Sequence, residues 1–168
     1  MDTFETIRTV LAVRKYQDKP VPQEVIRRTI EAGRLTASSM NQQPWHFIVV
    51  EDRQTLQQLG KLANTGPYIA GAALAIVVAI ERTRFAVSDG SRAIQSMILA
   101  AWSEGVSSNW VGFMGPDSVK TPLNIPDEMD VLAIVPFGYP AEKIGTGKKN
   151  RKLMKEVVSR ERFGQPYE

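Results

Sequence analysis

One unbroken apolar segment does most to restrict the fold of this chain. Residues 69–80 read IAGAALAIVVAI, twelve positions without a charged side chain. A membrane-spanning helix needs roughly twenty apolar residues, so this segment is too short to cross a bilayer. A short apolar run of this kind is typical of a strand buried on both faces. The sequence therefore predicts a sheet with at least one fully buried strand.

Helical and strand patterns alternate irregularly along the rest of the chain. Apolar spacing predicts a first helix that ends near Val13, a second opened by Pro22, and a strong third over residues 89–104 that Gly105 closes as a C-cap. Shorter helices are predicted within residues 55–64 and 145–158, and further strands at residues 46–52, 107–113 and 131–140. Because two helices precede any strand and no strict strand–helix–strand repeat follows, we expect an α+β fold in one domain, residues 1–168.

Composition excludes most catalytic chemistry based on side chains. The 168 residues contain no cysteine and only one histidine, His46, so thiolate nucleophiles and Cys- or His-based metal sites are not expected. No phosphate-binding loop, dinucleotide fingerprint or nucleophile elbow is present. An enzyme of this composition would take its chemistry from a cofactor.

Charge and the N-terminus bear on partners and location. The net charge of +3 is weak support for nucleic-acid binding, although seven Lys and Arg residues crowd positions 148–168. The first residues lack the basic and apolar regions of a signal peptide. A chain without cysteine suits a reducing compartment, so we expect a cytoplasmic protein with no membrane or nucleic-acid partner.

A polar stretch raises the clearest functional question. Residues 38–47, SSMNQQPWHF, place two hydroxyls and three carboxamides before a Pro-Trp pair and a predicted strand. These groups can satisfy the backbone of a turn, or they can hold a flat polar ligand at a sheet edge. The pattern alone leaves both interpretations open.

Four segments resemble the nitroreductase family of FMN-dependent oxidoreductases, and the resemblance runs nearly end to end. The first, VRKYQDKPVP at residues 13–22, is similar to the segment that closes the family's first helix, where an Arg-Arg-Ser-x-Arg motif holds the FMN phosphate. Arg14 matches the last Arg. Val10, Leu11 and Ala12 stand where the family has two Arg and a Ser, so two positive charges and a hydroxyl are lost.

The second segment, TASSMNQQPW at residues 36–45, resembles the family's Pro-Ser-x-x-Asn-x-Gln-Pro-Trp signature, with Ala37 in place of Pro. In the family this loop comes from the partner subunit and contacts the ribityl chain and ring of the flavin. The resemblance therefore implies that four residues of this loop bind the cofactor: Ser38, Ser39, Asn41 and Gln43.

The third segment, EGVSSNWVGFMG at residues 104–115, is similar to the family's Gly-Leu-Gly-Ser-x-Trp-Ile-Gly element, whose backbone lies along the flavin ring. The matching positions are Trp110, Val111, Gly112 and Phe113. The fourth, GKKNRKLMKEVV at residues 147–158, resembles a closing basic element in which Lys149 and Arg151 would reach the phosphate. Asn64 lies near the place of a further polar contact to the flavin.

The resemblance implies a fold, a cofactor and a reaction. The fold is a central, mainly antiparallel sheet flanked by helices, in an intertwined homodimer with FMN sites at the interface. NAD(P)H would give a hydride to FMN, and a nitroaromatic, quinone or similar small-molecule acceptor would take the electrons in a ping-pong cycle, with no catalytic side chain and no metal. The substitutions at residues 10–12 leave an alternative open, a non-catalytic or flavin-carrying dimer with the same fold. Five aromatic residues are candidates for an acceptor pocket: Trp45, Tyr68, Trp102, Trp110 and Phe113.

Overall fold

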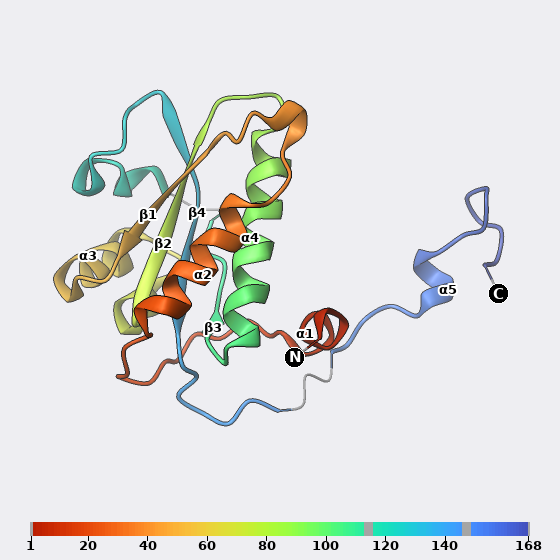
Figure 1. The fold of residues 1–168 in the computed structure, drawn as a ribbon, viewed down its shortest axis with the longest axis horizontal. Helices are drawn as coiled ribbons and strands as arrows, with labels where there is room; N and C mark the ends of the chain where they lie inside the picture. Colours follow the sequence, from red (N-terminus) through yellow and green to blue (C-terminus); the bar gives the residue numbers. More distant parts are fainter. Residues whose placement is uncertain (1, 113–115, 146–148, 168) are drawn as a thin grey trace.

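A four-stranded sheet organises the computed structural model, which describes residues 2–112, 116–145 and 149–167 (Figure 1). The strands are β1 (Trp45–Val50), β2 (Leu74–Glu81), β3 (Ser107–Ser108) and β4 (Met129–Gly138), in the spatial order β1-β2-β4-β3. Every neighbouring pair is antiparallel, with Val49 opposite Ile76 and Val77 opposite Ile134. This arrangement confirms the predicted α+β fold and its antiparallel sheet.

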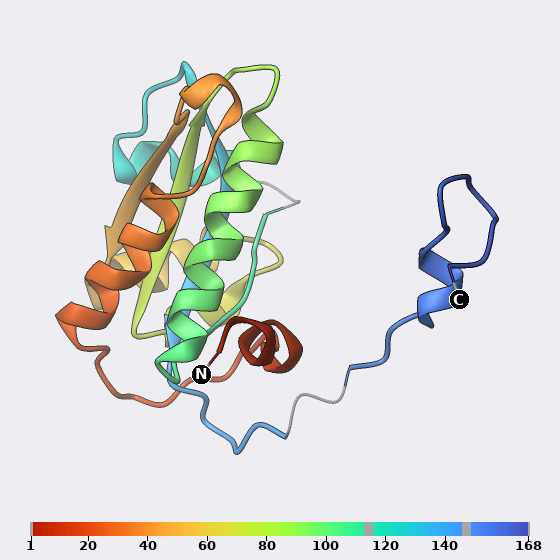
Figure 2. The ribbon, with the colours of Figure 1, turned by 45° about the vertical axis from the view of Figure 1, so that its right-hand side comes forward.

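Helices cover both faces of the sheet. The α-helices are α1 (Thr3–Thr9), α2 (Gln23–Arg34), α3 (Arg53–Leu62), α4 (Ala86–Ser103) and α5 (Met154–Val157). Short 3₁₀ helices are η1 (Ser39–Asn41), η2 (Pro67–Gly71), η3 (Pro116–Val119) and η4 (Thr121–Leu123). Helices α2 and α4 lie side by side on one face of the sheet, and α3 lies on the other (Figures 1 and 2).

Strand β2 is the centre of the core, as its apolar sequence predicts. Successive side chains of a strand point to opposite faces. Val77 therefore packs with Leu56 of α3, whereas Ile76 and Val78 pack with Met97 of α4. All of these side chains are buried.

Several predicted elements have different bounds in the structure, and the first helix and the third strand are shorter than predicted. The first helix ends at Thr9 and not near Val13, because Ala12 bridges to Ser108 and the Val13 amide donates to the Ser108 carbonyl, which requires extended backbone. The predicted third strand, residues 107–113, shrinks to Ser107–Ser108 with one isolated bridge from Val111 to Ile134. The strong helix is confirmed, although α4 begins three residues earlier, and Gly105 follows it with φ +78°.

The C-terminal residues 149–167, called the arm below, project away from the body in both views (Figures 1 and 2). Within the arm, Ser159 bridges to Pro166, and the Arg160 amide donates to the Gln165 carbonyl. Five large apolar side chains of the arm are exposed: Leu153, Met154, Val157, Phe163 and Tyr167. No helix in the described residues is both long and apolar enough to span a bilayer.

Candidate functional site

A hollow of about 450 Å³ lies where α1, α4, β3 and the start of the arm meet. It collects residues that are far apart in the sequence. Its lining comprises Ile7, Val10, Leu11, Ala12, Gln95, Ile98, Ser108, Asn109, Trp110, Lys149 and Arg151. Three predicted cofactor-binding residues, Trp110, Lys149 and Arg151, are thus brought together, and we call this space the cationic hollow.

Positive charge is crowded around the cationic hollow. The Lys149 ammonium donates a 2.6 Å hydrogen bond to the Ile7 carbonyl. Burial lowers the pKa of Lys149, and the positive charges of Arg151 and Arg8 lower it further. Arg8 is ion-paired with Glu5 at 2.6 Å, whereas Arg151 has no carboxylate partner among the residues that the structure describes. An anion bound here would relieve the repulsion between these cations.

Trp110 lines the same hollow, and its indole Nε1 lies against Gly112. Its indole Nε1 is buried and has no hydrogen-bond partner in the described part of the chain. Gly112 makes room for this ring, because a Cβ atom at Gly112 would overlap Nε1 and lie 3.0 Å from the Leu132 carbonyl oxygen. The two cations of the hollow, Lys149 and Arg151, are donors that suit a phosphate. The residues present therefore fit the phosphate of the cofactor that the sequence predicts.

The apolar replacements in the first-helix motif face this hollow as well. Val10, Leu11 and Ala12 all line it, at the positions where two Arg and a Ser would stand. Their side chains contribute no hydrogen bond to a phosphate. The positive charge of the hollow thus comes from the arm and from Arg8, which the sequence analysis did not select.

Arg14 and Asn64 lie outside the cationic hollow. Arg14 lines a neighbouring hollow of about 290 Å³ that shares Leu11 and Ala12 with the first. Its guanidinium carbon lies 5.7 Å from the centre of the Tyr68 ring, and the Tyr68 hydroxyl accepts a hydrogen bond from the Asn109 side chain. Asn64 follows α3 and is exposed. The structure thus adds Tyr68 and Asn109 as polar neighbours of Arg14.

The predicted ring-contacting segment is only partly described. The Val111 amide donates to the Ile134 carbonyl at 2.9 Å, and the Ile134 amide donates back at 2.7 Å. Both backbone groups of Val111 are therefore engaged within the sheet. Phe113 lies outside the described residues, so Gly112 is the last position of this segment that the structure places.

Residues 38–43, called the polar turn below, lie at the start of α4, where Ser39 contacts Asp89. The Ser38 hydroxyl accepts from the Gln43 amide at 2.9 Å, and the Gln43 side chain donates to the Asn41 side-chain oxygen at 3.2 Å. Met40, Asn41 and Gln43 adopt left-handed backbone, with φ of 53°, 56° and 50°. Such conformations cost of order 1–3 kcal/mol in residues other than glycine.

The polar turn does not line the cationic hollow of its own chain. Its Ser39 contacts Asp89 near the start of α4, whereas the nearest residue of the hollow on this helix, Gln95, lies six residues further along. At 1.5 Å per residue this separation is about 9 Å. Ser38, Ser39, Asn41 and Gln43 therefore lie close to one another but do not line the hollow that contains Lys149 and Arg151.

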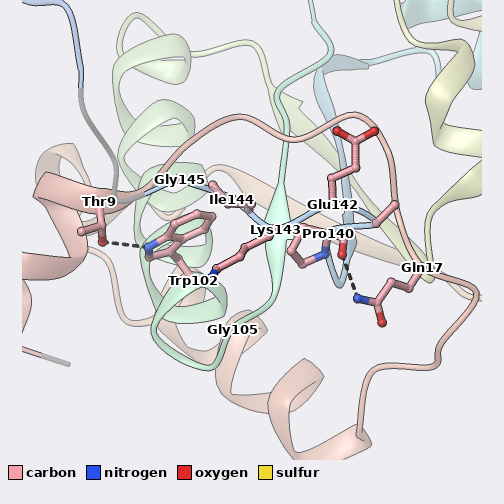
Figure 3. A pocket seen from close by; sticks show the side chains of 10 residues that line it. Thr9, Gln17, Trp102, Gly105, Pro140, Glu142, Lys143, Ile144 and Gly145 are labelled. Atoms are coloured by element: carbon pink, nitrogen blue, oxygen red, sulfur yellow. Dashed lines mark hydrogen bonds between the residues drawn. The ribbon is translucent and has the colours of Figure 1, made fainter.

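A larger, more apolar hollow of about 540 Å³ lies beside the end of α1 (Figure 3). Trp102 donates its indole proton to the Thr9 hydroxyl at 3.0 Å, and Gln17 donates to the Pro140 carbonyl at 2.8 Å. Among the residues that the structure describes, Trp102 is the only aromatic candidate that lines it, and none of the predicted cofactor-binding residues does. Trp45 stacks on Phe47, with 6.1 Å between their ring centres.

Comparison with known proteins identifies what this chain is similar to. A model of the family described as "Nitroreductase family" matches residues 8–81 and 62–139. A Methanothermobacter thermautotrophicus protein named "Putative NADH dehydrogenase/NAD(P)H nitroreductase" is 34% identical over 155 residues, which cover 87% of this chain and 81% of that protein.

Solved structures show the same arrangement. A Parabacteroides distasonis protein with that same name has a TM-score of 0.87 and 31% identity, over 96% of this chain and 98% of the other. A Desulfovibrio desulfuricans structure, described as a "putative nitroreductase in complex with fmn", has a TM-score of 0.84 and 26% identity, over 97% and 98% of the two chains.

Proposed function

The chain belongs to the nitroreductase family, and we propose that it is an FMN-dependent oxidoreductase that uses NAD(P)H. The observation that carries this proposal is the cationic hollow, where Lys149, Arg151 and Trp110 gather at the end of the first helix. Relatives named for NAD(P)H nitroreductase activity, and a similar structure with FMN, support the same cofactor and electron donor.

In this proposal the protein binds and orients, and the cofactor supplies the redox chemistry. FMN, when bound, accepts a hydride from a nicotinamide and passes two electrons to a second substrate. Lys149 and Arg151 would hold the phosphate through charge-assisted hydrogen bonds, and the family resemblance assigns Arg14 to the phosphate as well. On the same resemblance we assign Asn64 and residues 110–113 to the flavin.

We further propose that the site is completed by a second copy of the chain. The polar turn does not line the cationic hollow of its own chain, and in this proposal it serves the hollow of the second copy. The arm offers the means of association, because its turn at Ser159–Pro166 is isolated and its apolar side chains are exposed. An isolated two-stranded turn is marginally stable in water, so the arm needs a surface to pack on. An intertwined homodimer meets both needs.

The acceptor is a small oxidised molecule such as a nitroaromatic or a quinone. Because donor and acceptor would occupy the same space in turn, we propose a ping-pong cycle, which predicts parallel lines in double-reciprocal plots at several acceptor concentrations. We also propose that the protein acts in the cytoplasm, as one domain over residues 1–168.

One observation favours a second candidate, a dimer that binds flavin weakly or carries it without turnover. The cationic hollow is apolar at Val10, Leu11 and Ala12, so two arm residues would bear most of the phosphate contact. Hydrogen bonds to charged groups contribute roughly 1.5–3 kcal/mol each. Loss of several such contacts would weaken the complex substantially.

The visible spectrum of the purified protein with added FMN tests these candidates. An oxidoreductase shows a bound-flavin band that bleaches under anaerobic NADH or NADPH and returns in air. A bound band that no nicotinamide bleaches would identify a carrier, and failure to bind FMN would overturn both candidates. Lys149→Met should weaken FMN binding, while Lys152→Met, an exposed neighbour in the arm, serves as the matched control.

A further inference from the structure

One buried carboxylate is unused by the proposed site. Asp89 lies near the start of α4 and is 0% exposed, and it is the one charged side chain classed as buried in the described part of the chain. A buried charge is costly unless it is paired and hydrogen-bonded. The partners of Asp89 therefore indicate what holds it in the fold.

Three of the four hydrogen bonds to Asp89 come from one residue of the polar turn. The Ser39 amide donates to both carboxylate oxygens at 3.1 Å, and the Ser39 hydroxyl donates to one of them at 3.0 Å. Arg92, one turn further along α4, donates to the same oxygen at 2.5 Å. An ionised carboxylate only accepts, so each of these contacts fixes the direction of a donor.

The residues that follow Ser39 need a contact such as that between Ser39 and Asp89 to hold their backbone conformation. Met40, Asn41 and Gln43 have positive φ, and Met40 is 76% exposed, so packing of its side chain does not hold it in place. Disfavoured backbone of this kind persists only where the surroundings determine it. Within the turn, the bond from the Gln43 amide to Ser38 closes the loop, and Asp89 attaches that loop to α4.

We infer that Asp89 is a positioning residue for the flavin site, which holds the polar turn through Ser39 in the conformation that presents Asn41 and Gln43 to the partner's cofactor. This inference rests on the proposed function. It also gives Ser39 a defined role, because a hydroxyl that donates its proton to Asp89 has only lone pairs to offer a ligand. Asn41 and Gln43 are both exposed, and although the Gln43 side chain donates to Asn41, the Asn41 side-chain NH₂ and the Gln43 side-chain oxygen remain for a ligand.

The test compares Asp89→Asn with Asp130→Asn in the full-length protein. Asp130 is a matched control, since it is a half-exposed carboxylate paired with Arg82 at 2.9 Å and makes no contact with the polar turn. FMN affinity is measured by quenching of flavin fluorescence, at a temperature where every variant is folded. Amide hydrogen exchange of the polar turn is measured without FMN.

Asp89→Asn should weaken FMN binding by about tenfold or more, because Ser39 of the polar turn loses its hydrogen bonds to a charged acceptor. The visible circular dichroism of the bound flavin should change as well. Exchange at Ser39 and Gln43 should accelerate. Asp130→Asn should change none of these. A folded Asp89→Asn protein with wild-type affinity, flavin spectrum and exchange would overturn the inference, even if its thermal stability fell.

Ser39→Ala keeps the inference testable if Asp89→Asn does not fold. It removes one donor to Asp89 and keeps the amide bonds. Weaker FMN binding together with faster Gln43 exchange supports the inference. Weaker binding with unchanged exchange would mean that the hydroxyl acts on FMN directly, and no change in either would also contradict the inference.

The exchange measurement separates this inference from the proposed function. If the wild-type protein does not bind FMN, the oxidoreductase proposal is wrong. Amide hydrogen exchange in Asp89→Asn still shows whether Asp89 holds the polar turn in place. Unchanged exchange there overturns the inference independently of any flavin.

Discussion

The polar turn, at the start of α4, and the cationic hollow, beside the middle of α4, are built in opposite ways. In the turn, hydrogen bonds join Ser39 to Asp89 and the Gln43 amide to Ser38. Three residues of the turn nevertheless adopt left-handed backbone conformations. In the hollow, the backbone of Ala12 pairs with Ser108, but cations crowd one another and the indole Nε1 of Trp110 is unpaired. The unfavourable energy of the polar turn is backbone strain, whereas that of the cationic hollow is repulsion between positive charges.

This difference predicts whether each region reaches its binding conformation before or after a ligand binds. The polar turn is hydrogen-bonded in the free protein, so it is preorganised. In the hollow, the repulsion between cations is relieved only when an anion binds. Substitutions at the two regions should therefore separate effects on folding from effects on binding.

The largest expected effect comes from removal of both arm cations. Lys149→Met with Arg151→Met should weaken FMN binding by at least about a hundredfold, because hydrogen bonds to charged groups contribute roughly 1.5–3 kcal/mol each. Titration followed by flavin fluorescence measures the change. The charge-matched control is Lys152→Met with Lys155→Met, two exposed lysines of the same arm. An equal loss in the control would assign the effect to net charge alone.

Gly112→Ala should damage the hollow through packing. The added methyl group would overlap Trp110 Nε1, and overpacking of this kind costs about 1–3 kcal/mol. Urea unfolding should show this loss, and FMN affinity should fall as the ring moves. Gly145→Ala, whose Cβ would meet nothing within 4 Å, is the control. Unchanged stability in Gly112→Ala would show that Trp110 shifts without cost.

Met40→Val tests the strain in the polar turn. A β-branched residue tolerates positive φ poorly, so we expect a loss of about 1 kcal/mol although Met40 is 76% exposed. Leu35→Val, also exposed but with φ of −79°, should change stability by less than about 0.5 kcal/mol. Met40→Gly should not cost more than Met40→Val. Equal costs for Met40→Val and Leu35→Val would exclude strain.

The smallest effect concerns pH and Lys149. Its pKa is lower in the folded chain than its ordinary value of 10.5, so protonated Lys149 costs the fold stability at neutral pH. That cost disappears as pH rises through the folded pKa toward 10.5. Without FMN, wild type should therefore gain stability relative to Lys149→Met as pH increases over this window. A pH-independent difference in urea unfolding, or one of opposite sign, would contradict the crowding of charge.

Local pattern was sufficient for much of the fold. The apolar run at residues 69–80 predicted the buried strand β2, and the stripe of Ile94 and Met97 predicted α4 with Gly105 after it. These features depend on periodicity and on glycine's freedom at positive φ, which operate within a few residues. The family resemblance, now confirmed, selected the arm cations and the polar turn as well.

Residue identity thus determined which chemical groups the protein has: a strand that must be buried, a turn rich in amides, and basic residues near the C-terminus. Tertiary structure alone decided where they meet. Pairing of Ala12 and Val13 with Ser108 ended α1 early, and burial of Asp89 beside Ser39 joined positions fifty residues apart. Such contacts depend on the packing of distant segments, so no local periodicity encodes them.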